Sequence, residues 1–414
     1  MANSILQRYP ALGFPKYRRF WFASFASVGA TQLITLGQGW LIFELTGSAL
    51  QLGVLGAAAA VPNILMTLIG GVVADRFDKR IILMSTSLVI ALLLASLAWL
   101  DFTGAVRVWQ VLTVAALVSL VSGLDWPTRV SIYTHLIDRR AFMSAVALNS
   151  FIWQSTRMAI PALGGLIILY WDTWTLFALG SIGFFVMFWA MTGIHVKVVE
   201  TSDSSPLQQM QEGLRFIWST HLFRWLMALT FFGMFFSSSV SQIMPVFADM
   251  LGTGETGFGY LLSAGGIGSV IGTLLVGGME KFEKLGRVML GGAAMAILTM
   301  MLFAWAAHAG WYLPTLALAF LTALFASVYI VTSMTVMQLS VPDRMRGRVM
   351  GIHTIGFSLI PLGGLFLGTL AETTGASIAV LAGNGIYLAF LLFIVGQKSI
   401  RRLDGRRLAE APGG

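Results

Sequence analysis

The chain has 414 residues, of which 57% are hydrophobic and 11% are charged, and its formal net charge is +8. A typical soluble domain carries about 25% charged residues, so this composition excludes an ordinary water-soluble protein. Cysteine is absent, which excludes a disulfide framework, a thiolate zinc site and a cysteine nucleophile. The basic residues form no patch with interleaved aromatic residues, so we expect no nucleic-acid partner.

Twelve apolar runs are long enough to cross a hydrocarbon core of about 30 Å. They begin near Phe20, Leu50, Ile81, Val108, Ala141, Thr173, Leu226, Thr256, Val288, Gly310, Val349 and Thr373. The first run is too long for the apolar region of a signal peptide and no small-residue cleavage site follows it, so we interpret it as a span. The pattern predicts an all-α membrane protein with twelve transmembrane helices.

The distribution of positive charge predicts the topology. When the loops are assigned alternately to the two sides, 23 of the 26 Lys and Arg residues lie on the side that holds both termini, and only Arg107 lies on the other. Positive residues accumulate in cytoplasmic loops. We therefore expect a multi-pass protein of the bacterial cytoplasmic (inner) membrane with both termini in the cytoplasm. The two remaining residues, Arg129 and Arg157, fall inside the fourth and fifth runs.

The longest polar stretch divides the runs into two sets of six. The predicted parts are a cytoplasmic N-terminal tail (1–19), an N-terminal six-helix bundle (20–194), a cytoplasmic linker (195–224), a C-terminal six-helix bundle (225–397) and a basic cytoplasmic tail (398–414). Within the linker, Ser205, Pro206 and Gln208 have the pattern of a helix start. Apolar residues then recur at helical spacing, which predicts an amphipathic helix on the membrane surface.

The two halves resemble each other in sequence. GGVVADRFDKRIILM from Gly70 parallels GGMEKFEKLGRVML from Gly277, and PALGG from Pro161 parallels PLGG from Pro361. Together with the number of spans, these repeats indicate two pseudo-symmetric six-helix bundles that enclose a cavity near the bilayer midplane.

The loop between the second and third runs reads GVVADRFDKR from Gly71. Here the chain resembles the major facilitator superfamily, whose signature in this loop is a glycine, three residues, Asp-Arg and then basic residues. Asp78 stands where the general signature has glycine, as in the branch that contains enterobactin exporters and macrolide efflux proteins. Other segments similar to that branch are ELTGSALQLG from Glu44, DWPTR from Asp125, AVALNS from Ala145, IPALGG from Ile160, PVFADMLG from Pro245 and PDRMRGRVMG from Pro342. The resemblance implies the major facilitator fold and alternating access.

The same resemblance implies a cytoplasmic gate. Its residues would be Gly71, Asp75, Arg76, Lys79, Arg80, Asp343, Arg346 and Arg348. Asp75 would then approach Arg346 and Arg348 at the start of the eleventh span, and these contacts would be made and broken as the transporter switches. The alternative is that the charged residues only cap helix ends and fix the topology.

Charged residues inside the spans need a separate explanation. Asp125 and Arg157 both lie near mid-membrane by helical rise, where a charge costs at least about 2.5 kcal/mol, so each should be paired or face an aqueous cavity. Asp125 can pair with Arg157, or with Arg129 four residues further along the same helix. An unpaired Arg157 in a cavity would favour an anionic solute, whereas an Arg157 paired with Asp125 would favour none.

Two residues are candidates for proton coupling. Asp125 is the only carboxylate deep inside a predicted span, with a structural or gating role as the alternative. His353 in the eleventh span is the second candidate because an imidazole titrates near neutral pH, with a packing role as the alternative. Many relatives in this branch carry an acidic residue in the first span, where this chain has Gly29-Ala30-Thr31-Gln32. We expect no cofactor, with the proton gradient as the driving force.

Polar and aromatic residues in the spans that line the cavity of this fold suggest a substrate site. The candidates are Gln32, Gln38, Asn149, Trp153, Gln242 and Tyr329, although each can instead hydrogen-bond a neighbouring helix. No phosphate loop, metal-ligand cluster or nucleophile and base pattern occurs, so we expect no metal site, no catalytic residue and no enzymatic activity.

These features predict a secondary transporter that works by alternating access. The segment PALGG from Pro161 resembles part of an antiporter signature, and the branch implies proton-coupled export of a siderophore or an amphipathic drug. The expected partners are a small-molecule substrate and the lipid bilayer, and the superfamily implies a monomer. One alternative is a uniporter or importer of a small metabolite or metal chelate. The other is a membrane ligand sensor or scaffold that transports nothing.

Overall fold

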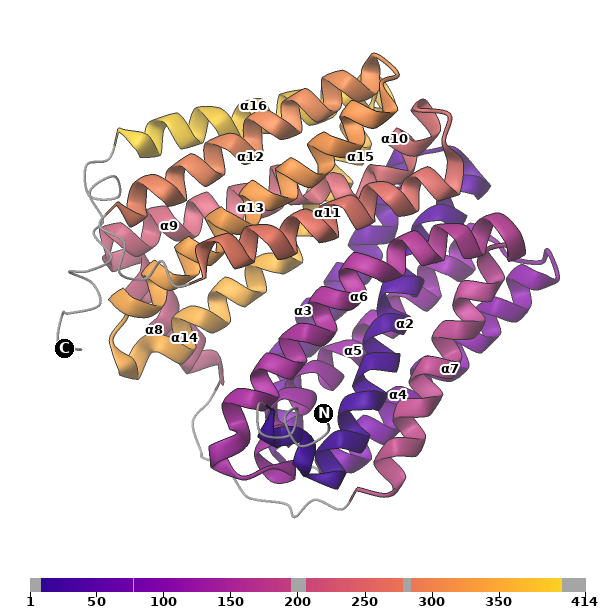
Figure 1. The fold of residues 1–414 in the computed structure, drawn as a ribbon, viewed down its shortest axis with the longest axis vertical. Coiled ribbons are helices and arrows are strands. Elements are labelled where there is room, and N and C mark those ends of the chain that lie inside the picture. The colour runs from indigo at the N-terminus through magenta and orange to yellow at the C-terminus, as the bar shows by residue number, and fades with distance from the viewer. Residues whose placement is uncertain (1–8, 77, 195–205, 278–283, 397–414) are drawn as a thin grey trace. The chain divides into compact units, whose positions relative to one another are not determined.

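The computed structural model describes residues 9–76, 78–194, 206–277 and 284–396, with side chains omitted at 67–76, 126–127, 130–131, 133–135, 139, 206–210, 343–344, 346–347 and 354–355. The described residues form helices joined by short turns, and no strand occurs among them (Figure 1). The helices divide into two compact units. Unit 1 contains residues 1–45 and 58–203, and unit 2 contains residues 46–57 and 204–414.

Unit 1 is built from long helices in chain order (Figure 1). They are the 3₁₀ helix η1 (Pro10–Gly13), α2 (Pro15–Thr46), α3 (Ala49–Arg76), α4 (Lys79–Phe102), α5 (Val108–Leu136), the 3₁₀ helix η2 (Arg139–Ala141), α6 (Phe142–Trp171) and α7 (Thr173–Thr192). The first residues of α3 pack within unit 2 and the rest of the helix belongs to unit 1. One buried core of unit 1 joins α2, α4, α5 and α7 through Phe20, Leu83, Ile132 and Met187.

Unit 2 begins with an amphipathic helix and continues with long apolar ones. The elements are α8 (Pro206–Ser219), α9 (His221–Phe232), the π turn η3 (Gly233–Ser237), the 3₁₀ segment η4 (Ser238–Ile243), α10 (Met244–Met250), α11 (Gly254–Val276), α12 (Leu285–His308), α13 (Tyr312–Ser340), α14 (Asp343–Ile355), the 3₁₀ turn η6 (Gly356–Ser358), α15 (Leu359–Thr374) and α16 (Ala376–Val395). Its core joins α9, α12, α13 and α16 through Leu226, Met289, Val336 and Leu391.

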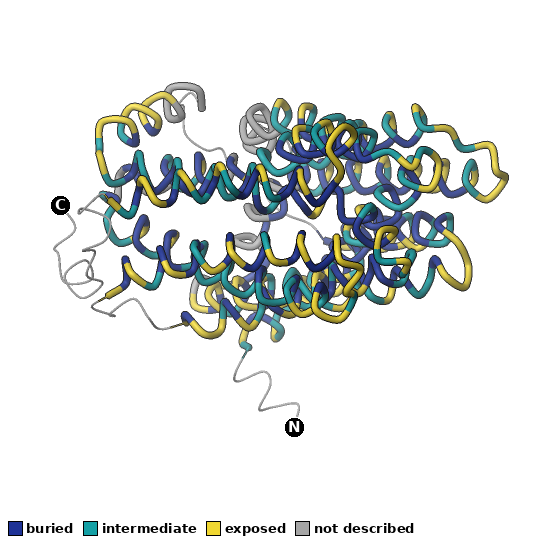
Figure 2. Tube along the Cα trace, turned by 90° about the horizontal axis from the view of Figure 1, so that it is seen from above, coloured by how far each residue is buried: buried dark blue, intermediate teal, exposed yellow. Residues whose placement is uncertain are grey.

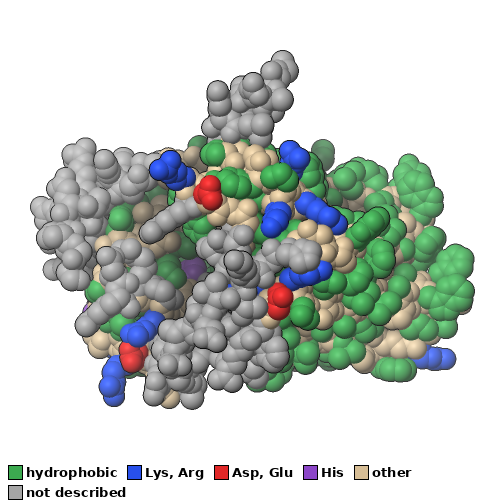
Figure 3. Space-filling model, turned by 90° about the horizontal axis from the view of Figure 1, so that it is seen from below, with side chains coloured by type: hydrophobic (Ala, Val, Ile, Leu, Met, Phe, Trp, Pro, Cys, Tyr) green, Lys and Arg blue, Asp and Glu red, His purple; other side chains and the backbone are tan. Residues whose placement is uncertain are grey.

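The structure confirms the twelve predicted spans. Twelve helical stretches among the described residues are long and apolar enough to cross a membrane. Buried and exposed residues alternate along these helices (Figure 2), as expected when one face packs on protein and another meets lipid. Seen from one end, Lys and Arg side chains lie near the helix ends, whereas hydrophobic side chains cover the helix flanks (Figure 3). This distribution is that of a protein whose helix flanks lie in hydrocarbon.

The seventh and eleventh spans are not continuous α-helices. The seventh, His221–Met250, passes through the π turn η3 and the 3₁₀ segment η4, and the eleventh, Arg348–Thr374, is interrupted by η6. Pro245 lies in the first turn of α10, where its missing N–H cannot continue the preceding helix. The two broken spans pack against each other within unit 2, because α15 contacts both η3 and η4.

The repeated Pro and Gly segments have corresponding positions in the two units. A Cβ added at Gly164 in the fifth span would lie 2.6 Å from Leu36 in the first span. A Cβ at Gly363 in the eleventh span would lie 2.9 Å from Ser239 in the seventh and would also meet a backbone carbonyl there. Each glycine therefore lets its span approach the first span of its own six-helix set. This correspondence gives a physical reason for the PALGG and PLGG repeat.

Candidate functional site

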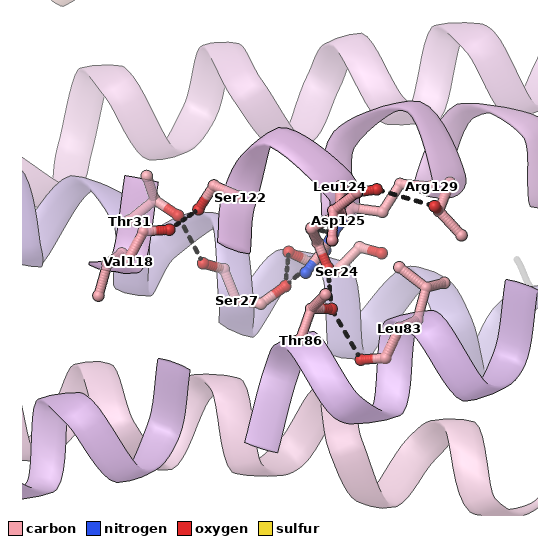
Figure 4. Close-up of polar contacts among 11 residues, drawn as sticks. Ser24, Ser27, Thr31, Leu83, Thr86, Val118, Ser122, Leu124, Asp125 and Arg129 are labelled. Atoms are coloured by element: carbon pink, nitrogen blue, oxygen red, sulfur yellow. Dashed lines mark hydrogen bonds and ion pairs between the residues drawn. The ribbon is translucent and has the colours of Figure 1, made fainter. Parts of the chain in front are cut away.

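A buried ion pair lies within unit 1, on α5. Asp125 and Arg129 are 7% and 6% exposed, and Arg129 Nε donates to Asp125 Oδ2 across one helical turn (Figure 4). The other carboxylate oxygen accepts a 2.9 Å hydrogen bond from the Thr86 hydroxyl of α4. Both oxygens of Asp125 are therefore engaged. Of the two pairings that the sequence left open, the structure has Asp125–Arg129, and the Asp125–Arg157 pair is not formed.

The pair is also tied to the first span. Arg129 Nη1 donates a 2.8 Å hydrogen bond to Ser27 Oγ on α2, and Ser27 Oγ in turn donates to the Ser24 carbonyl at 3.2 Å (Figure 4). Three helices, α2, α4 and α5, thus converge on one neutral charge pair. A buried charge is tolerable when it is paired and hydrogen-bonded, and here both carboxylate oxygens of Asp125 and two nitrogens of Arg129 have partners.

Arg157 lies in a different environment. It is about midway between Phe142 and Trp171 on α6, and its side chain is exposed. Among the residues whose side chains the structure describes, it forms no hydrogen bond or ion pair. An exposed, unneutralised cation in the middle of a span is a costly feature that usually marks a functional position.

His353 in the eleventh span is buried. It is 3% exposed, and its Nε2 atom has no hydrogen-bond partner among the described residues. Its ring lies edge-on to Phe357, with 6.2 Å between ring centroids. An imidazole with an unused nitrogen retains the capacity to exchange a proton.

The predicted cavity residues fall into two groups. Gln32, Asn149, Trp153 and Gln242 are partly exposed. Gln38 is 8% exposed, and its Nε2 has no partner in the described part of the chain.

Tyr329 is 4% exposed and belongs to the core of unit 2. Its hydroxyl lies 2.8 Å from the Thr230 hydroxyl. Tyr329 therefore occupies a packing position in this structure.

Several predicted gate residues lie outside the described side chains: Gly71, Asp75, Arg76, Asp343 and Arg346. Of the others, Lys79 is buried at the start of α4. Arg80 donates to the carbonyls of Met191 and Thr192 at 3.1 and 2.7 Å, which fastens α4 to the end of α7. Arg348 pairs with Glu212 of the amphipathic helix α8. Arg80 and Arg348 thus each connect two helices of their own unit.

Sequence reasoning missed Glu372 at the end of α15. Its carboxylate accepts hydrogen bonds from the Ser48 hydroxyl at 3.0 Å and from the Leu50 backbone N–H at 3.2 Å. Ser48 directly precedes α3 and Leu50 lies in its first turn, and both residues belong to unit 2. A carboxylate at this position satisfies a free N–H and complements the positive helix end. Ser48 directly before an apolar run was the available signal, but nothing in the pattern indicated that the acid comes from another span.

No cluster of three or more His, Asp or Glu residues that could hold a metal ion occurs among the described residues.

The sequence of the chain is similar to those of known transporters. Residues 9–410 match the family MFS_3, described as "Transmembrane secretion effector". The chain is 24% identical to the staphyloferrin A transporter of Staphylococcus aureus, over 93% of this chain and 97% of that protein. It is 26% identical to the multidrug efflux pump Tap of Mycolicibacterium fortuitum, with 94% and 97% coverage. It is 23% identical to the enterobactin exporter EntS of Shigella flexneri, with 96% and 94% coverage.

Solved structures of similar fold are also transporters. A bacterial homolog of the human lysosomal transporter Spinster, in an inward-facing and occupied conformation, matches with a TM-score of 0.72 and 15% identity, over 96% of this chain and 98% of that one. The nucleoside transporter NupG (D323A mutant) matches with a TM-score of 0.71 and 13% identity, over 91% and 98%. At these identities the likeness concerns the fold.

Proposed function

The chain belongs to the MFS_3 transmembrane secretion effector family, and from this premise we propose that it is a proton-coupled exporter of a siderophore or an amphipathic drug-like molecule. The observation that carries the proposal is the family match over residues 9–410, which leaves almost no part of the chain unaccounted for. As a member of this transporter family the chain is not an enzyme.

The relatives support the direction and the solute class. Two of them are named for export, one of enterobactin and one of multiple drugs, and a third is named a staphyloferrin A transporter. All three align over nearly the whole chain. We infer export from the cytoplasm through a bacterial inner membrane, with both termini cytoplasmic, because the basic residues concentrate on that side of the predicted topology.

Alternating access would be carried out by the predicted gate residues. Asp75, Arg76, Asp343 and Arg346 would form contacts that are made in one state and broken in the other. Arg348 is held by Glu212 in this structure, so a change of partner at Arg348 would accompany switching.

Asp125 and His353 are the two candidates for the residue that carries the coupled proton. Asp125 is neutralised by Arg129 and bonded to Thr86, which favours a structural role for this carboxylate. His353 has an unused ring nitrogen, which favours it as the proton carrier. A coupling residue must gain and lose a proton during the cycle, and an imidazole titrates closer to neutral pH than any other side chain.

Everted membrane vesicles with a respiration-driven pH gradient test the proposal. Enterobactin and a macrolide are added in turn to vesicles with wild-type protein, His353→Gln, Asp125→Asn or no transporter. We expect one solute to dissipate the gradient in wild type and not in His353→Gln. Solute accumulation without any change in the gradient would contradict proton coupling and favour a uniporter. Specific solute binding without flux would favour a sensor.

A further inference from the structure

Arg157 is a cation in the middle of a span with no counter-charge that the described residues supply. By helical rise it lies about 20 Å from each end of α6, beyond the reach of acids at the helix ends. Among the described side chains of unit 1, the carboxylate at comparable depth is that of Asp125, which is already neutralised by Arg129. Arg157 therefore keeps its full charge available for another molecule.

Exposed side chains lie on more than one side of α6. The exposed apolar side chains of α6 include Phe151, Leu163 and Leu169. At 3.6 residues per turn, Phe151 and Leu169 lie about 120° around the helix axis from Arg157 in one direction and Leu163 lies about 120° from it in the other. Val146, which is 40% exposed, lies within about 20° of Arg157. Ser150, which is also exposed, lies within about 20° of it, two turns earlier. The side of α6 that carries Arg157 therefore exposes both polar and apolar side chains.

Gln154 lies on the same side of α6 as Arg157. It is three residues before Arg157 and partly exposed, so its amide lies on the neighbouring turn of the same side. The arrangement offers a guanidinium with five N–H donors beside an amide and a hydroxyl. Such a set suits a ligand with closely spaced anionic oxygens, because the planar guanidinium can bind two of them in parallel.

We propose that Arg157 is the anion-binding residue of the substrate site and that the transported solute carries a carboxylate or catecholate group. The inference rests on the proposed transport function and narrows its solute class. A permanently cationic amphiphile would place a like charge against Arg157 and would be disfavoured. Within the proposed range of solutes, an acidic siderophore therefore fits this residue and a cationic drug does not.

Binding to purified full-length protein in lipid nanodiscs tests the inference separately from transport. The anionic probes are staphyloferrin A, enterobactin and carboxyfluorescein, and the cationic probe is ethidium. The variants are Arg157→Gln and Arg157→Lys. Arg140→Gln is the matched control, because Arg140 is an exposed arginine at a helix boundary. Gel filtration and thermal unfolding of each variant establish that it is folded.

We expect at least one anionic probe to bind wild type and to bind Arg157→Gln about ten- to a hundredfold more weakly, the range for a lost hydrogen bond to a charged group. The affinity of Arg157→Lys for the anionic probes should lie between those of wild type and Arg157→Gln, because lysine keeps the charge but lacks the planar guanidinium. Arg140→Gln should bind every probe with the same affinity as wild type. Ethidium should bind Arg157→Gln at least as well as wild type.

Three results would overturn the proposal. They are unchanged binding of the anionic probes by folded Arg157→Gln, an equal loss for anionic and cationic probes, and failure of wild type to bind any anionic probe. If Arg157→Gln does not fold, Arg157→Lys provides the test. Binding of the anionic probes by Arg157→Lys that equals wild-type binding and does not depend on salt concentration would contradict the proposal. Arginine-dependent binding without flux in vesicles would leave this inference intact and contradict the proposed export.

Discussion

Arg129 Nη1 lies 2.8 Å from Ser27 Oγ, and this hydrogen bond joins the ion pair of the fourth span to the first span. The bond explains how a charge pair is accommodated inside an apolar unit. Asp125 neutralises the guanidinium within one helix, and Ser27 and Thr86 satisfy further groups from two neighbouring helices. The pair therefore contributes to the packing of three helices in unit 1.

The Asp125→Asn substitution should destabilise unit 1 strongly. It leaves the buried Arg129 charge without a counter-ion, and breaking a buried pair from one side costs about 3 to 5 kcal/mol. The measurement is the apparent Tm of the purified protein in detergent. Asp138→Asn is the control, because Asp138 is exposed. An unchanged Tm for Asp125→Asn would show that the pair is dispensable for packing.

Removing both charges should lower the stability of the protein by less than the sum of the two single substitutions. In Asp125→Asn combined with Arg129→Gln, no uncompensated charge remains, so the coupling energy in a double-mutant cycle should be favourable by about 0.5 to 3 kcal/mol. Ser27→Ala in the same background should have a smaller effect than in wild type, because its partner has been removed. Strict additivity of the Tm changes would contradict the network.

Glu372 should hold the start of α3 through the Leu50 amide. Since this N–H donates to the carboxylate at 3.2 Å, Glu372→Ala should increase hydrogen exchange in the peptide that covers residues 46–57. Mass spectrometry of the exchanged protein measures this directly.

Glu255→Ala is the matched control for Glu372. Glu255 lies in the first turn of its own helix α11, so its loss should leave the 46–57 peptide unchanged. Exchange in that peptide that is the same in Glu372→Ala and in wild type would show that the capping bond does not stabilise the start of α3.

The spans were predictable because long apolar runs have few alternatives in a chain with so little charge. Their boundaries were less so. The first helix begins at Pro15 rather than near Phe20, because hydropathy detects the hydrocarbon core and not the polar turn that precedes it. The breaks at η3 and η6 were not predicted either, since the apolar character continues through both and only Gly233 and Gly356 mark them.

The candidate site was predictable in part. The four-residue spacing indicated Asp125–Arg129 as one of two pairings, but no pattern distinguished it from Asp125–Arg157. Ser27 and Thr86 were not predictable as partners, because single hydroxyl residues are common in spans and usually bond their own helix. Tyr329 was assigned to a cavity from its polar group, whereas its ring is part of a packed core.

Glycine substitutions provide the last test, because the chain supplies two helical glycines with opposite surroundings. An added Cβ at Gly268 of α11 would be blocked by the backbone carbonyl of Phe320 on α13, whereas one at Gly291 of α12 would meet nothing within 4 Å. Backbone cannot move aside as a flexible side chain can, so Gly268→Ala should force the two helices apart and lower the Tm by several degrees. Gly291→Ala should leave the Tm unchanged or raise it, since alanine favours a helix by up to about 1 kcal/mol over glycine. Equal effects of the two substitutions on the Tm would contradict the close approach of α11 and α13.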